Sequence, residues 1–252
     1  MDRILNIETS TGVCSVTVSS GRAVLAARES VVERSHAAML TVFIQEAVSE
    51  AGISVGDLSA VAVSRGPGSY TGLRIGVSAA KGICYGAGVP LIAIDTLKLM
   101  ALKVAGMLNP GPHENDTGNK GADKLPVLMG PGSDNVLLCP MIDARRMEVY
   151  TALYDIEGGL VKDVSAEIID ESSFRDIPDE QKILFFGDGS DKCKDVISHP
   201  NTHYIPDIYP SAVQMAELSH KAFAEGRFED TAYFEPFYLK DFIATTPKNK
   251  MI

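Results

Sequence analysis

The chain has 252 residues, enough for one large domain or two smaller ones. Hydrophobic residues make up 45% of it and charged residues 22%, so it can bury a core and is not globally disordered. The 33 acidic side chains outnumber the 23 lysines and arginines, which gives a net charge of −10. Because nucleic-acid affinity comes mainly from lysine and arginine contacts to phosphates, this balance argues against a free-standing DNA or RNA binder. It leaves open a subunit of a larger nucleic-acid machine.

Cysteine spacing and hydropathy favour a reducing, aqueous compartment. The four cysteines are widely separated and form no C-x-x-C pair: Cys14, Cys84, Cys139 and Cys193. The longest apolar stretch, residues 89–108, contains Asp95 and two lysines, which excludes a membrane-spanning helix. The first residues enter a strand without a signal-peptide pattern. We therefore expect a cytoplasmic protein that makes no membrane contact.

The first part of the chain has the patterns of an α/β fold. Apolar and β-branched residues predict a hairpin over residues 3–18 and a third strand over residues 23–29. From Ser35 the apolar residues recur at helical spacing, and this helix ends at Gly52. The elements expected next are a strand (60–64), a glycine-rich loop (65–72), a helix of small residues ending near Gly86, and a strand (91–95).

Residues 107–134 differ in composition from the rest of the chain. Nine of these 28 residues are glycine or proline, and most of the others are polar. Such a segment buries too little apolar surface to order itself, so it predicts a mobile insertion. It divides the chain into an N-terminal lobe, residues 1–106, and a C-terminal lobe, residues 107–252, that begins with the insertion.

The second part repeats the order of the first. An apolar strand ends in Asp143, a turn and two further strands follow, and a later apolar run ends in Gly187-Asp-Gly189. The first part likewise has an acid, Glu8, then a three-stranded meander and a strand that leads into Gly66-Pro-Gly68. The shared order predicts a duplicated unit.

The glycine-rich loop is the most informative motif. Residues 64–74 lie between an apolar strand and a helix, where free backbone N–H groups and the helix dipole favour an anion. Ser69 and Thr71 can cap the helix or donate to an oxygen. No Gly-Lys-Ser/Thr follows, so this is not a Walker A loop. A tight strand-to-helix turn that binds nothing remains the alternative.

The first hairpin turn, Glu8-Thr-Ser-Thr-Gly12, is a second candidate for phosphate contact. Its hydroxyl and N–H donors could hold phosphates while the carboxylate holds magnesium through water. An ordinary polar turn is the alternative. His199 and His203 have H-x-x-x-H spacing, but Pro200 argues against a helical pair of ligands, so we predict no metal site.

A stripe of small residues runs along the helix after the loop. Gly72, Gly76 and Ala80 are spaced at i, i+4 and i+8, so they share one helix face and allow another backbone to come close. The stripe predicts either packing within the chain or an interface with a second chain.

Four segments together resemble the TsaB (YeaZ) family. The longest is Gly66-Pro-Gly-Ser-Tyr-Thr-Gly-Leu-Arg-Ile-Gly76, supported by Ile7-Glu-Thr-Ser10, Ile142-Asp-Ala-Arg145 and Gly187-Asp-Gly189. The match runs in order from residue 4 to about residue 240. The resemblance implies an α/β fold of two RNase H-like lobes of the actin/Hsp70 (ASKHA) type, with mixed sheets flanked by helices.

The resemblance also implies a function. Members of this family act in making threonylcarbamoyladenosine next to the tRNA anticodon, as non-catalytic partners of the TsaD (Kae1-like) transferase, together with the ATPase TsaE. The catalytic relative holds its metal with a histidine pair, and Thr96 and Met100 stand at the matching positions here. Relatives usually have Asp where this chain has Glu8. The missing histidine pair favours a pseudo-enzyme subunit, and the longer Glu8 side chain argues against metal-assisted nucleotide binding. No protease constellation is present to support the older name of glycoprotease.

Our leading hypothesis is therefore a scaffold subunit that binds and stabilises TsaD. Helices 35–51 and 71–86 would dock on equivalent helices of the partner as a four-helix bundle. The free chain could pair with a second copy, and tRNA would be met only through the complex. The side chains expected at this interface are Met39, Phe43, Gly72, Leu73, Gly76, Val77 and Ala80.

Two rival functions involve a nucleotide. An actin-fold ATPase or kinase would hold ATP between the loops, and weak ATP or ADP binding could survive in a scaffold too. The candidate, vestigial nucleotide-binding residues are Glu8, Thr9, Ser10, Gly12, Gly66, Gly68, Ser69, Thr71, Asp143, Gly187 and Gly189. A dinucleotide-binding oxidoreductase would use Asp95 for the ribose, but a Rossmann unit begins β-α-β and not with a hairpin.

Overall fold

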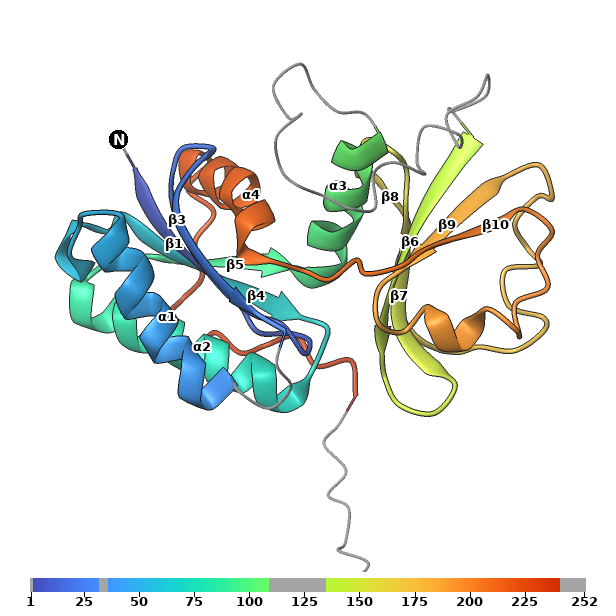
Figure 1. Ribbon diagram of the computed structural model, residues 1–252, viewed down its shortest axis with the longest axis horizontal. Helices are drawn as coiled ribbons and strands as arrows, with labels where there is room; N and C mark the ends of the chain where they lie inside the picture. The colour runs from blue at the N-terminus through green and yellow to red at the C-terminus, as the bar shows by residue number, and fades with distance from the viewer. Residues whose placement is uncertain (1, 32–35, 109–134, 241–252) are drawn as a thin grey trace, which may run out of the picture.

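The computed structural model describes residues 2–31, 36–108 and 135–240, which form two α/β lobes side by side (Figure 1). The first lobe contains a five-stranded sheet of order β3-β2-β1-β4-β5. The first three strands are antiparallel, and β4 and β5 run parallel to β1. Its elements are β1 (Arg3–Glu8), β2 (Cys14–Ser20), β3 (Ala23–Ser30), α1 (His36–Glu50), β4 (Ala60–Gly66), α2 (Tyr70–Ala87) and β5 (Leu91–Asp95).

The second lobe repeats this arrangement. Its sheet has the order β10-β9-β6-β7-β8, again with an antiparallel meander and two strands parallel to the first. The strands are β6 (Val136–Asp143), β7 (Glu148–Tyr154), β8 (Leu160–Ile168), β9 (Lys182–Phe186) and β10 (Thr202–Ile205). Identical strand order and direction are what a duplicated unit predicts.

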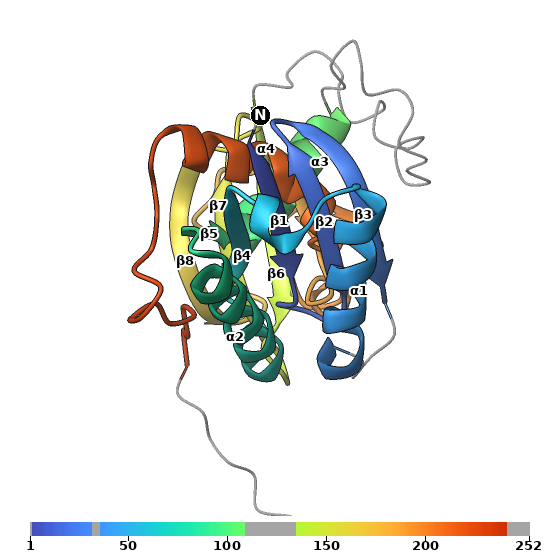
Figure 2. The same ribbon diagram turned by 90° about the vertical axis from the view of Figure 1, so that its left-hand side faces the viewer.

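The copies differ in their helices. Turns occupy the described chain between β8 and β9, where the first lobe has α1, and only a one-turn 3-10 helix, Asp191–Cys193, stands between β9 and β10. The first lobe therefore carries the only long helix pair on an outer sheet face within the described residues (Figure 2).

Helix α1 lies on the first sheet because of its apolar spacing. Every third or fourth residue is buried against the strands: Leu40, Phe43, Ile44, Ala47 and Val48. Helix α2 is capped at its N-terminus by Ser69, whose Oγ accepts the Gly72 N–H at 3.2 Å. Gly88 caps its C-terminus in the left-handed region, with φ of 68°.

The last helix of each half covers the other half's sheet. Helix α3 (Thr96–Leu108) packs Leu97, Val104 and Leu108 against residues of β6, β7 and β9. Helix α4 (Ala212–Ala224) packs Ala212 and Met215 against the first sheet, on the face opposite α1 and α2 (Figure 1). The division of the chain into two lobes at residue 106 stays a prediction. In space the two halves exchange helices, because α3 packs on the second sheet and α4 on the first.

Helix α3 continues two residues into the predicted insertion, because Leu108 is buried in the second core. Residues 109–134, the remainder of that insertion, lie outside the described residues. None of the described helices is both long and apolar enough to cross a membrane.

Candidate functional site

The turn after β1 is closed on itself. Glu8, Thr9 and Ser10 have no solvent exposure. The Ser10 N–H donates to Glu8 Oε1 at 2.6 Å, and the Thr9 hydroxyl donates to the Gly72 carbonyl of α2 at 2.8 Å. The Ser10 N–H and the Thr9 hydroxyl are thus both used on groups of the chain itself.

Burial controls the protonation of Glu8. Loss of hydration raises its pKa to about 7, although hydrogen bonds from Ser10 and Ser64 lower it. Its Oε2 atom and the Ser10 hydroxyl have no hydrogen-bond partner within the described part of the chain. Glu8 therefore keeps its proton to a higher pH than an exposed glutamate does.

The glycine-rich loop touches the Glu8 turn directly. The Ser69 N–H donates to the Ser10 carbonyl at 2.6 Å. A β-carbon on Gly68 would lie 2.2 Å from the same oxygen, so glycine is required there by close approach. The structure therefore brings together five of the predicted residues: Glu8, Thr9, Ser10, Gly68 and Ser69.

Three other predicted residues of the first lobe have different surroundings. Gly12 is exposed, and Thr71 is exposed on the outer face of α2. Gly66 has φ of +111°, and a β-carbon there would meet the Phe237 carbonyl at 2.8 Å. The Gly66 position is covered by the C-terminal segment, residues 225–240, which we call the strap.

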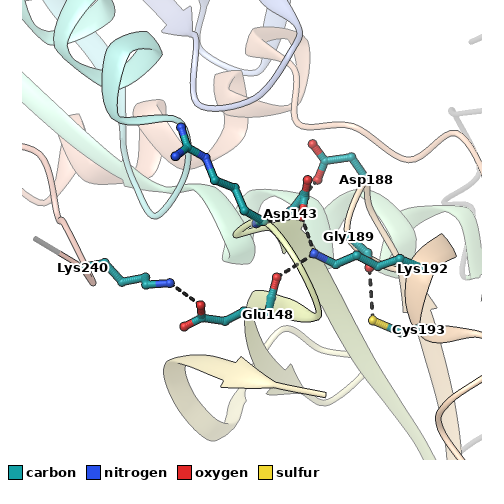
Figure 3. Close-up of polar contacts among 8 residues, drawn as sticks. Asp143, Glu148, Asp188, Gly189, Lys192, Cys193 and Lys240 are labelled. Carbon is teal, nitrogen blue, oxygen red and sulfur yellow. Dashed lines mark hydrogen bonds and ion pairs between the residues drawn. The ribbon is translucent and has the colours of Figure 1, made fainter. Parts of the chain in front are cut away.

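The second-lobe candidates lie together at the ends of β6 and β9 (Figure 3). The Gly189 N–H donates to the Met141 carbonyl at 3.0 Å, and a β-carbon on Gly187 would lie 2.2 Å from that carbonyl. Asp143 forms an ion pair with Lys192, whose ammonium also donates to the Glu148 carbonyl at 2.7 Å. Asp188, whose pKa burial raises, accepts the Asp143 N–H at 3.0 Å.

These contacts do not fit a phosphate seat. The Thr9 hydroxyl and the Ser69 N–H donate to carbonyls across the contact between turn and loop, the Ser10 N–H donates to Glu8, and Lys192 already neutralises Asp143. Among residues 2–31, 36–108 and 135–240, no three histidine, cysteine or carboxylate side chains gather as metal ligands. Thr96 and Met100 are buried at the start of α3. Nucleotide binding stays a prediction, and this geometry argues against it.

The strap links the two groups of residues. The Phe237 N–H donates to the Arg65 carbonyl at 2.7 Å, and Lys81 Nζ donates to the carbonyls of Ala232 and Phe234 at 3.0 Å each. At its end Lys240 forms an ion pair with Glu148 of the second lobe. No pattern in the sequence indicates the strap, because these contacts use mostly backbone atoms.

Six of the seven predicted interface residues are buried within this chain. The β-carbons of Gly72 and Gly76 would lie 2.1 Å from Thr9 O and 2.2 Å from Thr9 Oγ1, so the small stripe packs inside the chain. Only Met39 of the set is partly exposed, and the buried members are Phe43, Gly72, Leu73, Gly76, Val77 and Ala80.

A groove between α1 and α2 lies on their other face, with a volume of about 560 Å³. Small or short side chains form most of its walls, and one end carries Tyr70 and Arg74. The residues that line it are Ala37, Leu40, Thr41, Tyr70, Thr71, Arg74, Ile75, Ser78 and Ala79. Three of them, Thr71, Ile75 and Ala79, follow an i, i+4 spacing that could have indicated this face from the sequence. Each lies one residue before a member of the glycine stripe.

Two duplicated lobes that exchange their last helices define a two-lobed α/β protein of the actin/Hsp70-like class. The fold matches YeaZ from Pseudomonas aeruginosa with a TM-score of 0.71 at 23% identity, over 95% of this chain and 100% of that one. The tRNA threonylcarbamoyladenosine biosynthesis protein TsaB of Escherichia coli is 30% identical over 96% of both chains. The chain belongs to the TsaB family, which confirms the resemblance seen in the sequence.

A further similarity concerns the transferase itself. The family model TsaD, tRNA N6-adenosine threonylcarbamoyltransferase, matches residues 29–112. The enzyme of that name from Cereibacter sphaeroides is 32% identical over 57% of this chain and 34% of its own. The matched segment contains α1, α2 and α3.

Proposed function

We propose that this chain acts in tRNA threonylcarbamoyladenosine biosynthesis as a non-catalytic subunit that docks on the TsaD transferase through the α1–α2 groove. TsaE and tRNA then join through that complex, in the cytoplasm. In the absence of the transferase, a second copy of the chain covers the same groove.

The observation that carries the proposal is the exposed face of two adjacent helices. Ala37, Thr41, Ser78 and Ala79 present small side chains there, so the helices of a partner can approach closely. Tyr70 and Arg74 at one end are residue types that concentrate binding energy in interfaces.

Similarity to the transferase explains why that partner is suited to this face. Residues 29–112 match the TsaD model, so the partner has helices related to α1 and α2. Two related helix pairs can face each other about an approximate two-fold axis, the commonest symmetry of protein dimers.

The closed turns support the non-catalytic role. Glu8 is buried with its carboxyl facing its own turn, and the positions matching the metal ligands hold Thr96 and Met100 inside the core. We expect no threonylcarbamoyladenosine from this chain alone, and product only when the transferase, TsaE and the adenylate-forming enzyme are added. Turnover by the chain alone would contradict the proposal.

The docking face is tested with Ser78→Arg, which places a long charged side chain in the groove from an exposed position. The matched control is Ser49→Arg, an exposed position of α1 that shares a hollow with Arg28 of β3 and does not line the α1–α2 groove. In calorimetric titration against TsaD, Ser78→Arg should weaken binding at least about tenfold while the control binds as the unmodified chain does. Equal affinity of the two variants would exclude this groove.

A further inference from the structure

We infer that the β6–β7 hairpin of this subunit binds the phosphate backbone of the RNA substrate in the assembled complex, through Arg145 and Arg146. The inference rests on the proposed function for the presence of RNA and of a transferase partner. It adds an RNA contact on a chain whose net charge of −10 gives no sign of one.

Both arginines lie at the exposed tip of the hairpin. They follow Asp143 and precede Glu148, and the tip is held by hydrogen bonds from Arg145 N to Asp143 Oδ1 at 2.9 Å and from Ala144 N to Glu148 O at 3.0 Å. The tip is thus fixed by its backbone, and the two guanidinium groups are not needed to hold it.

The backbone at this tip is unfavourable for arginine. Arg145 has φ of 72° and Arg146 φ of 49°, in the left-handed region where glycine and asparagine are accommodated more easily. Two consecutive arginines in this region destabilise the fold more than glycine or asparagine would at the same positions. Their side chains are therefore expected to have a use outside the fold.

The two guanidinium groups have no acid of their own. Across residues 2–31, 36–108 and 135–240, no ion pair includes Arg145 or Arg146. The acids nearby have partners of their own: Asp143 pairs with Lys192, Glu148 pairs with Lys240, and the exposed Asp188 accepts the Asp143 N–H (Figure 3). Arg145 and Arg146 are thus two exposed cations without an ion-pair partner among the described residues, beside two lysines that already pair with acids.

Position relative to the docking groove favours RNA over a small anion. Lys240 forms an ion pair with Glu148 at the hairpin, and two residues earlier the Tyr238 ring packs against Tyr70, tilted by 38° with 4.9 Å between ring centres. Tyr70 lines the groove, so the hairpin lies beside the face on which the partner docks. An exposed tip next to a partner that holds RNA can meet its phosphates, whereas a small anion would need an enclosing pocket.

The test removes both positive charges and replaces the arginines with a residue that adopts positive φ more easily. The variant is Arg145→Asn with Arg146→Asn, and its melting temperature should equal or exceed that of the unmodified chain. The charge-preserving variant is Arg145→Lys with Arg146→Lys. Arg175→Asn, at an exposed arginine elsewhere, is the control for net charge.

The measurement is tRNA affinity of the complex with the transferase, by fluorescence anisotropy at several salt concentrations. The asparagine variant should lose roughly tenfold per arginine near 0.1 M salt, and the slope of log affinity against log salt should fall by about 2. The lysine variant and Arg175→Asn should keep the slope.

An unchanged slope and affinity in the asparagine variant would overturn the inference. Loss of transferase affinity in the same variant, by titration without RNA, would assign the hairpin to the protein interface and also overturn it. If the proposed docking on the transferase is wrong, the result is different: Ser78→Arg then leaves transferase binding unchanged.

Discussion

The Thr9 hydroxyl occupies the space that a β-carbon on Gly76 would need. An ideal β-carbon there would lie 2.2 Å from Thr9 Oγ1, and the same hydroxyl donates to the Gly72 carbonyl at 2.8 Å. Helix α2 thus sits directly on the turn after β1, and the glycines are required by that contact.

The first prediction concerns this contact. Gly76→Ala should lower the free energy of unfolding by about 1–3 kcal/mol, because the new methyl group overpacks against Thr9. In a Thr9→Ala background the same change should cost at least about 1 kcal/mol less. Denaturant unfolding of the four proteins measures the coupling. Gly82→Ala, where nothing lies within 4 Å of the new β-carbon, is the control and should stabilise the helix.

The second prediction is a pH dependence caused by Glu8. Its pKa is about 7 when folded against 4.5 ordinarily, so its contribution to stability is present in full below pH 4.5 and is lost as pH rises to 7. Glu8→Gln should therefore gain roughly 3 kcal/mol over the unmodified chain between pH 4.5 and pH 8. Urea unfolding at the two pH values tests this, and a difference independent of pH would contradict it.

The third prediction concerns the start of α4. Ser211 Oγ accepts the Val213 N–H at 3.3 Å and donates to Glu29, while Ser15 Oγ accepts the Ala212 N–H at 3.1 Å. Ser211→Ala removes the cap and leaves Glu29 without that donor, so it should cost about 1–2 kcal/mol. Thermal unfolding measures the cost. The exposed Ser78→Ala should change stability little, and an equal loss in both would argue against the cap.

The fourth prediction concerns the strap. Lys81→Met removes both hydrogen bonds from Nζ to the strap carbonyls and keeps the aliphatic stem. Hydrogen exchange of the Phe237 amide, which is bonded to Arg65 O, should become faster, with little change in the overall melting temperature. Unchanged exchange at Phe237 would mean that Lys81 does not hold the strap.

The fifth prediction addresses the nucleotide alternative. Because the Ser10 N–H, the Thr9 hydroxyl and the Ser69 N–H are used internally, millimolar ATP with magnesium should leave the melting temperature of the chain unchanged. A saturable increase would revive the actin-fold ATPase hypothesis.

Local patterns in the sequence predict most of the elements but few of the contacts between them. Alternating apolar residues locate β1 to β3, and the spacing of Leu40, Phe43 and Ala47 fixes the buried face of α1. The acid and Gly-x-Gly order also anticipates the repeated topology. These features depend on neighbours a few residues apart.

What the sequence could not predict depends on distant neighbours. Helix α2 has small residues on two faces, Gly72 and Gly76 on one and Ser78 and Ala79 on the other, and composition alone does not say which face is inside. The choice is made by Thr9, more than sixty residues earlier. The exchange of α3 and α4 likewise depends on how the lobes pack.

That exchange has a consequence for how the protein is made. As the chain leaves the ribosome, all five strands of the first sheet emerge before α4, and until residue 224 follows, Ile4, Ala62 and Ile92 lack their cover. Synthesis of the first lobe therefore cannot end in a finished, independent unit. Nascent first lobes expose an apolar surface throughout translation of the second, which makes this interval the one in which chaperones would engage the chain.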